Sequence, residues 1–228
     1  MTDRIQKTII SKFCNWRTLP RLAQSPFLIT KYILMKTLFI LLLLFLFTTI
    51  YGQSIRYVKQ EASGLADGSS WDNASNDLQA MLNTAWFGTE VWVATGTYKP
   101  TQYPFSCSGC TTNRDYSFFI YPGAKIYGSF AGYETDIAQR DIPANPTILS
   151  GDFNNNDIIT GDGSTLAMIG FEENAYHVLL ACDFSGGEMG VTIDGFIVTA
   201  GNANGSGYIE LSGKHILRGE GGGIHIYY

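Results

Sequence analysis

The sequence predicts an all-β solenoid, a β-helix, whose N-terminal end is capped by one helix. The chain of 228 residues contains 25 glycines, which separate short apolar segments of typical strand length. Several segments are apolar on consecutive residues, among them VWVA, FFI and HVLLA, which is typical of parallel strands covered on both faces. Helices do not alternate with these segments, so a doubly wound α/β sheet is excluded.

Residues 35–52 are predicted to be a secretory signal peptide. Lys36 precedes the apolar run from Leu38 to Phe47, and we expect cleavage after Gly52. The run is short for a membrane span, which needs about 20 apolar residues, although an uncleaved signal anchor is the alternative. Residues 1–34 carry six basic residues and one acid, and we interpret them as an extension upstream of a start at Met35. The sequence therefore predicts a secreted or outer-surface protein that meets the membrane only through its signal peptide.

The charge of the predicted mature chain excludes one class of partner. From residue 53 onward, 8 Lys and Arg residues face 19 Asp and Glu residues, a net charge of −11, whereas the whole chain carries −5. Nucleic-acid binding depends on neutralised phosphates, so we expect no nucleic-acid partner. An acidic surface is compatible with cation binding.

Two cysteines lie close together in a predicted loop. Cys107 and Cys110 enclose Ser-Gly and follow Pro104. In an exported protein this spacing favours a small disulfide. Unpaired thiols and a redox or metal role are the alternatives, but a redox motif needs a βαβ context that is absent here. Cys182 is interpreted as a small buried residue.

The elements follow one another from residue 53. Residues 53–90 are predicted to hold a short strand and the cap helix, because Leu78, Met81, Leu82 and Ala85 recur at helical spacing from about Ala74. Residues 91–228 are predicted to form the coils, with strands in EVWVAT, DYSFFI, AKIYGSF, PTILSGD, YHVLLAC, VTIDGFIVTA, KHILR and GGIHIYY. In a solenoid these strands stack on the coil before them. A β-sandwich is the alternative fold.

An ordered set of motifs runs through residues 55–228. It comprises GLADGSSWDNASNDLQAML, EVWVATGTYKPT, RDYSFFIYPGAKIYGSFAGYET, QRDIPANPTILSGD, IDGFIVTAGNANG and GGGI. The set resembles the right-handed parallel β-helix regions of secreted bacterial surface proteins of the pectin-lyase-like superfamily, of Bacteroidota type, and GGGI resembles polymorphic outer-membrane protein repeats. The resemblance implies further β-helix coils of a longer chain after Tyr228. It also implies that the sequence is C-terminally incomplete, through truncation or fragmentation.

The best metal candidate is a loop with alternating oxygen ligands. Asp152, Asn154 and Asn156, followed by Asp157, resemble the first half of a calcium loop. The later glycine and glutamate of an EF-hand loop are missing, and a polar loop rich in turn formers is the alternative. Ca²⁺ is the only cofactor that the sequence suggests.

Two functions fit the resemblance, because such regions serve both binding and catalysis. The first is a structural, adhesin-like role that presents a face to polysaccharide or to another cell. The alternative is a fragment of a polysaccharide lyase or glycoside hydrolase. Asp194 is more simply explained by a turn with Gly195, so we assign no catalytic residue. Trp86 and Trp92 are predicted to lie in the core, and Tyr103 and Phe105 are left open.

Overall fold

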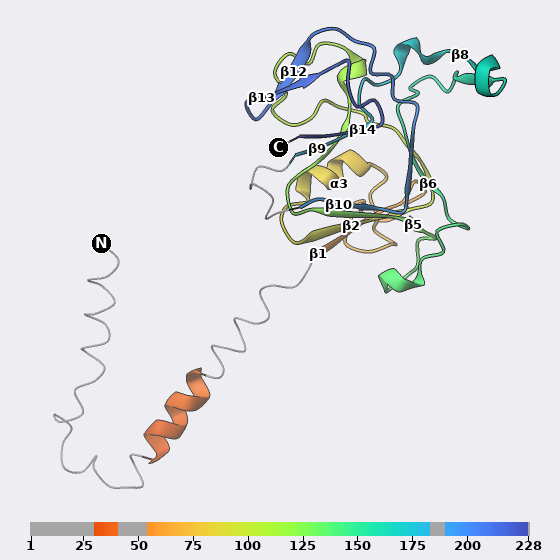
Figure 1. The fold of residues 1–228 in the computed structure, drawn as a ribbon. Coiled ribbons are helices and arrows are strands. Elements are labelled where there is room, and N and C mark those ends of the chain that lie inside the picture. The colour runs from red at the N-terminus through yellow and green to blue at the C-terminus, as the bar shows by residue number, and fades with distance from the viewer. Residues whose placement is uncertain (1–29, 41–53, 183–189, 228) are drawn as a thin grey trace. The chain divides into compact units, whose positions relative to one another are not determined.

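The computed structural model describes residues 30–40, 54–182 and 190–227 (Figure 1). The chain divides into two compact units, Met1–Gly52 and Gln53–Tyr228. In the first unit, residues 30–40 form an exposed helix. Residues 1–29 of the predicted extension and 41–52 of the predicted signal peptide lie outside the described residues. No helix within the described ranges is long and apolar enough to cross a membrane.

Three small parallel sheets form the frame of the second unit. Their strand orders are β1-β2-β5-β10, β3-β6-β11 and β4-β9-β14. The strands are β1 (Ser54–Val58), β2 (Thr89–Ala94), β3 (Gly96–Tyr98), β4 (Phe118–Ile120), β5 (Lys125–Phe130), β6 (Thr147–Ser150), β9 (Leu179–Cys182), β10 (Thr192–Asp194), β11 (Phe196–Thr199) and β14 (Ile224–Tyr227).

The chain visits these sheets repeatedly in the same order. It passes through β2, β3 and β4, then β5, β6 and β9, and then β10, β11 and β14. Equivalent residues therefore align between neighbouring strands: Val91 pairs with Ile126, which pairs with Ile193. Val91 and Ile126 are fully buried, and both belong to the main apolar core.

A short helix, α3 (Leu78–Thr84), lies against the first strands of this frame. Asp77 begins it by accepting a hydrogen bond from the Ala80 backbone N–H (3.0 Å), as an N-cap residue does. Leu78, Met81 and Leu82 are buried, and α3 packs on β4, β1 and β2. The predicted helix is thus confirmed, although it is shorter than expected.

Two antiparallel hairpins and several 3-10 helices interrupt the frame. The hairpins are β7 (Ile158–Thr160) with β8 (Ala167–Ile169), and β12 (Tyr208–Leu211) with β13 (Lys214–Leu217). The 3-10 helices are η3 (Asn113–Asp115), η4 (Ile137–Gln139), η5 (Gly163–Thr165) and η6 (Phe171–Glu173).

The prediction of an all-β right-handed parallel β-helix is wrong. The described chain mixes helix with strand, and its strands form several small parallel and antiparallel sheets that do not close into a solenoid. The apolar runs indicated covered strands, but they do not reveal the β7–β8 hairpin, whose strand residues are exposed. An exposed two-stranded hairpin needs no buried face, so the hydrophobic pattern does not reveal it.

Candidate functional site

Three aromatic side chains line a cleft beside the first sheet. The cleft has a volume of about 370 Å³ and is lined by Tyr57, Ser70, Trp71, Asp72, Gly132, Tyr133, Glu134 and Thr135. The rings of Tyr57 and Trp71 meet edge to face, with centroids 4.8 Å apart. The Trp71 indole N–H donates to the Glu134 carbonyl (2.8 Å), which fixes the ring. Tyr133 is 78% exposed, so its ring is available to a ligand.

A buried carboxylate holds the turn that presents Tyr133. Glu134 is 4% exposed and accepts backbone hydrogen bonds from Ala131 (2.6 Å), Gly132 (2.9 Å) and Tyr133 (3.0 Å). Burial disfavours the charged form, but these backbone donors outweigh it and lower the pKa of Glu134. Glu134 therefore remains ionised and positions Tyr133. The carboxylate of Asp72, which also lines the cleft, is exposed.

A second cleft lies at the start of α3 and is lined mainly by polar residues. It has a volume of about 490 Å³ and is lined by Gln60, Asn76, Asp77, Leu78, Thr97, Tyr98, Lys99, Thr101 and Asn155. Lys99 Nζ donates to Asn155 Oδ1 (2.7 Å), and Asp77 caps the helix. The ring of Tyr98 is 5% exposed, so this cleft offers little aromatic surface to a ligand.

The predicted calcium residues lie on one loop, but the loop is organised by its own hydrogen bonds. Asp152 accepts from the backbone N–H groups of Asn156 and Asp157, both at 3.3 Å. Asn154 and Asn156 are exposed, and with its amide oriented as its neighbours require, Asn156 donates to Glu173 Oε1 (2.8 Å). Within the described ranges, no three His, Cys, Asp or Glu side chains gather as a metal site.

Replacing Asp152 with alanine is expected to lower the free energy of unfolding by about 1–2 kcal/mol, because two backbone donors lose their acceptor. Burial opposes ionisation of Asp152, but the backbone donors lower its pKa. Thermal unfolding measures the effect, and Asn154→Ala on the same loop is the control. If Asp152 is a Ca²⁺ ligand, Ca²⁺ should raise the melting temperature of the wild type more than that of Asp152→Ala. Equal increases in the two proteins would contradict the predicted calcium site.

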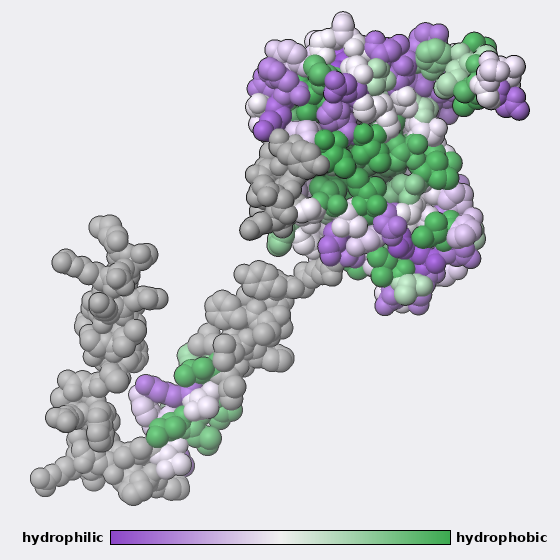
Figure 2. All heavy atoms as spheres, in the orientation of Figure 1, coloured by the Kyte–Doolittle hydropathy of each residue, from purple (hydrophilic) through white to green (hydrophobic). Residues whose placement is uncertain are grey.

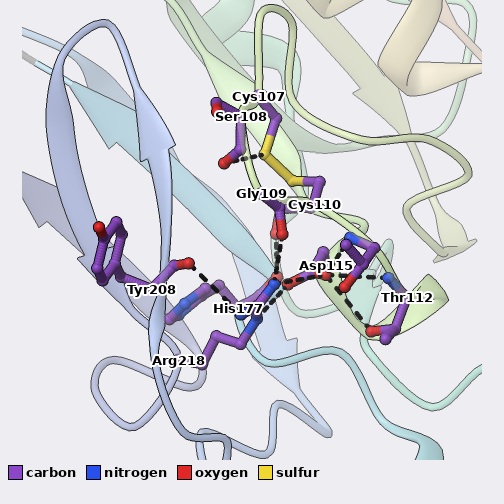
Figure 3. Close-up of a disulfide and its surroundings, with 11 residues drawn as sticks. Cys107, Ser108, Gly109, Cys110, Thr112, Asp115, His177, Tyr208 and Arg218 are labelled. Atoms are coloured by element: carbon purple, nitrogen blue, oxygen red, sulfur yellow. Dashed lines mark hydrogen bonds and ion pairs between the residues drawn. A yellow bond between two sulfur atoms is a disulfide. The ribbon is translucent and has the colours of Figure 1, made fainter.

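A disulfide and a buried ion pair hold the segment after β3. Cys107 and Cys110 are joined by a disulfide, and the Gly109 carbonyl between them accepts from Arg218 Nη2 (2.7 Å). Arg218 also binds Asp115 through Nε (2.7 Å) and Nη2 (3.0 Å). Figure 3 shows how Arg218 reaches both the disulfide turn and the Asp115 carboxylate. This network ties the β12–β13 hairpin to the loop.

The other residues singled out from the sequence take separate places. Asp194 ends β10 and pairs with Arg140 (2.6 Å). Trp92 is 3% exposed, so its core position is confirmed, whereas Trp86 is 61% exposed and its core prediction is wrong. Trp86 instead stacks on Tyr121 at the surface (4.8 Å). The side chain of Cys182 lies outside the described part of the structure.

Sequence reasoning did not identify the aromatic cleft. Tyr57, Trp71 and Tyr133 come from three separate segments. The pairing of β1 with β2 and of β2 with β5 brings the strand of Tyr57 near the end of β5. Hydrogen bonds from the Tyr57 N–H to the Gly68 carbonyl and from the Trp71 indole to the Glu134 carbonyl hold the Trp71 segment beside them. Exposed aromatic rings beside a carboxylate and hydroxyl groups form a surface on which a polar ring with apolar faces can stack. Comparison with family models, curated proteins and solved structures finds no match for this chain.

Proposed function

We propose that residues 54–227 form an exported, adhesin-like structural module that binds polysaccharide in the aromatic cleft. The observation that carries the proposal is the cleft itself, in which Tyr57, Trp71 and Tyr133 lie beside Asp72 and Ser70. A sugar ring offers apolar C–H faces to aromatic rings, and its hydroxyl groups bind to carboxylates and hydroxyls. Ligand sites commonly combine aromatic walls with a few polar groups, and a volume of about 370 Å³ is within their usual range.

Two further features support an exported binding module. The disulfide between Cys107 and Cys110 is typical of oxidising compartments outside the cytosol. The cleft walls are held in place before any ligand arrives, because Trp71 donates to the Glu134 carbonyl and Glu134 binds the turn before it. A preorganised site lowers the entropy lost on binding.

Replacing Tyr133 with alanine is expected to weaken polysaccharide binding about two- to twelvefold, because an exposed stacking ring contributes about 0.5–1.5 kcal/mol. A glycan array identifies the ligand, and titration calorimetry gives the dissociation constants of wild type and variant. The control is Phe105→Ala, which removes an aromatic ring that is 67% exposed and does not line the cleft.

The proposal fails if the array shows no binding, or if Tyr133→Ala and Phe105→Ala bind equally well. Incubation of the ligand with the protein, with and without Ca²⁺, separates binding from turnover. Depolymerisation of an acidic polysaccharide would favour a polysaccharide lyase and overturn the structural role.

A further inference from the structure

The β7–β8 hairpin projects from the second unit without a buried face. All residues of both strands are exposed, and Figure 2 shows apolar surface on the projection that Figure 1 labels β8. A two-stranded hairpin is marginally stable by itself in water. Its position therefore depends on the two segments at its base, which are Asp157 before β7 and Gly170 to Asn174 after β8.

Side chains join the two segments at the base of the hairpin. Asn174 Nδ2 donates to Asp157 Oδ2 (2.8 Å). The Asn156 amide, in the orientation that its neighbours require, donates to Glu173 Oε1 (2.8 Å) and to the Gly170 carbonyl (3.1 Å). An ionised carboxylate only accepts hydrogen bonds, so the bond to Asp157 fixes the orientation of the Asn174 amide and leaves its Oδ1 as an acceptor.

Two buried oxygens at this base have no donor among the described residues. Asn174 is 1% exposed, and its Oδ1 and the Oδ1 of Asp157 are both buried without a hydrogen-bond partner there. Buried side-chain polar atoms in native structures usually have a partner. Both oxygens belong to the side chains that the 2.8 Å bond joins, and both only accept. The ligand that satisfies them must donate a proton or carry a positive charge.

The charge at this base favours a cation over a water molecule. Asp152 lies on the same turn and is 9% exposed, and it accepts from the N–H groups of Asn156 and Asp157 at 3.3 Å, which is longer than an ordinary N–H···O bond. Among the described residues, neither Asp152 nor Asp157 forms an ion pair. Lys99 acts on Asp152 electrostatically, but its Nζ donates to Asn155. A water molecule would leave both carboxylates uncompensated, whereas a divalent cation neutralises them.

We propose that Asp152, Asp157 and Asn174 hold a Ca²⁺ ion at the base of the β7–β8 hairpin. Carboxylate and amide oxygens are the ligands that Ca²⁺ prefers, and water completes its shell of about six to eight oxygens. The sequence pattern indicated Asn154 and Asn156 as further ligands. Both are exposed, and the buried Asn174, 17 residues after Asp157, takes their place. This site does not depend on the aromatic cleft or on polysaccharide binding.

The test is titration calorimetry of the purified protein with CaCl₂, together with thermal unfolding. We expect a dissociation constant of about 0.1–1 mM, the range of extracellular calcium modules. About 10 mM Ca²⁺ should then raise the melting temperature by about 3–8 °C. The same concentration of Mg²⁺ should raise it less, because Mg²⁺ demands near-ideal octahedral geometry.

Two variants with opposite expected effects identify the ligands. Asp157→Asn removes a charge from the site and is expected to weaken Ca²⁺ binding at least about tenfold. The matched control is Glu172→Gln, which removes an exposed charge from the segment after β8 and should bind as the wild type does. Asn174→Asp places a second carboxylate beside Asp157, so it should lower the melting temperature without Ca²⁺ and increase the stabilisation that Ca²⁺ gives.

Three results would overturn the proposal. The first is a wild type that Ca²⁺ stabilises no more than Mg²⁺ does, which would assign the two buried oxygens to water. The second is equal Ca²⁺ affinity of Asp157→Asn and Glu172→Gln. The third is an Asn174→Asp variant that Ca²⁺ stabilises less than the wild type.

Discussion

Replacing Arg218 with alanine is expected to lower the free energy of unfolding by about 3–5 kcal/mol, the usual effect of removing one partner from a buried ion pair. The side chain of Asp115 is 1% exposed, and that of Arg218 is 14% exposed. Without Arg218 the Asp115 carboxylate stays buried with the backbone N–H groups of Thr111 (2.9 Å) and Thr112 (3.1 Å) and the Thr112 hydroxyl (3.5 Å) as its partners, none of them charged. The loss also removes the donor to the Gly109 carbonyl.

Urea denaturation under non-reducing conditions measures this loss, and Lys125→Ala is the matched control. Lys125 is 43% exposed and lies 3.9 Å from Glu90, so its replacement should change stability by less than about 1 kcal/mol. Equal effects of the two replacements would contradict the role given to the buried pair.

Acid is expected to remove the stability that the pair of Asp115 and Arg218 contributes. Burial opposes ionisation of Asp115, but Arg218 and the backbone N–H groups of Thr111 and Thr112 outweigh it and lower its pKa. The stability that follows from this lowered pKa is fully present when the pH is above about 3.9, the pKa of an aspartate in the unfolded chain. It is lost as the pH falls through the lower pKa that Asp115 has in the folded chain.

Local sequence patterns predicted the elements better than their partners. The spacing of Leu78, Met81 and Leu82 indicated the helix, but its start was expected near residue 74. The observed N-cap is Asp77, because its carboxylate reaches the Ala80 N–H. EVWVAT and KIYGSF became strands of one parallel sheet, since consecutive apolar residues need cover on both faces.

Long-range contacts explain most of what the sequence did not predict. Asp115 follows Arg114 directly in the sequence, yet it binds Arg218, which is 103 residues away. Arg114 instead donates to the Asn174 carbonyl (2.7 Å). The aromatic cleft depends on strand pairing in the same way. Pairing of distant segments depends on the whole fold, so no local pattern reveals these contacts.

Acidification from about pH 7 to about pH 4 is expected to remove about 3 kcal/mol of stability through His177 alone. His177 is 1% exposed, and its Nε2 has no hydrogen-bond partner. Nδ1 lies 3.2 Å from the Gly221 carbonyl, which can only accept, so Nδ1 carries the proton of the neutral ring. The pKa of His177 is lowered from 6.5 to about 4, mainly by burial; the hydrogen bond to Gly221 opposes this shift, and the nearby His225 adds to it.

The direction of the pH effect follows from proton uptake. Between about pH 6.5 and about pH 4 the unfolded chain binds a proton at His177 that the folded chain excludes, so unfolding is favoured as the pH falls. The stability contributed by the neutral His177 ring is fully present above about pH 6.5, its pKa in the unfolded chain. It is lost below about pH 4, its pKa in the folded chain. The carboxylates Asp115, Glu134 and Asp152, whose pKa values are lowered, add their losses at still lower pH.

Urea denaturation at a series of pH values measures how the free energy of unfolding changes with pH. His177→Asn is the informative variant. The asparagine amide can still donate to the Gly221 carbonyl, but it does not titrate, so stability should become nearly constant between about pH 6.5 and about pH 5. His215→Asn, at an exposed position on β13, should keep the wild-type slope. A wild-type stability that is constant over this range, or an unchanged slope in His177→Asn, would show that the buried ring does not govern acid unfolding.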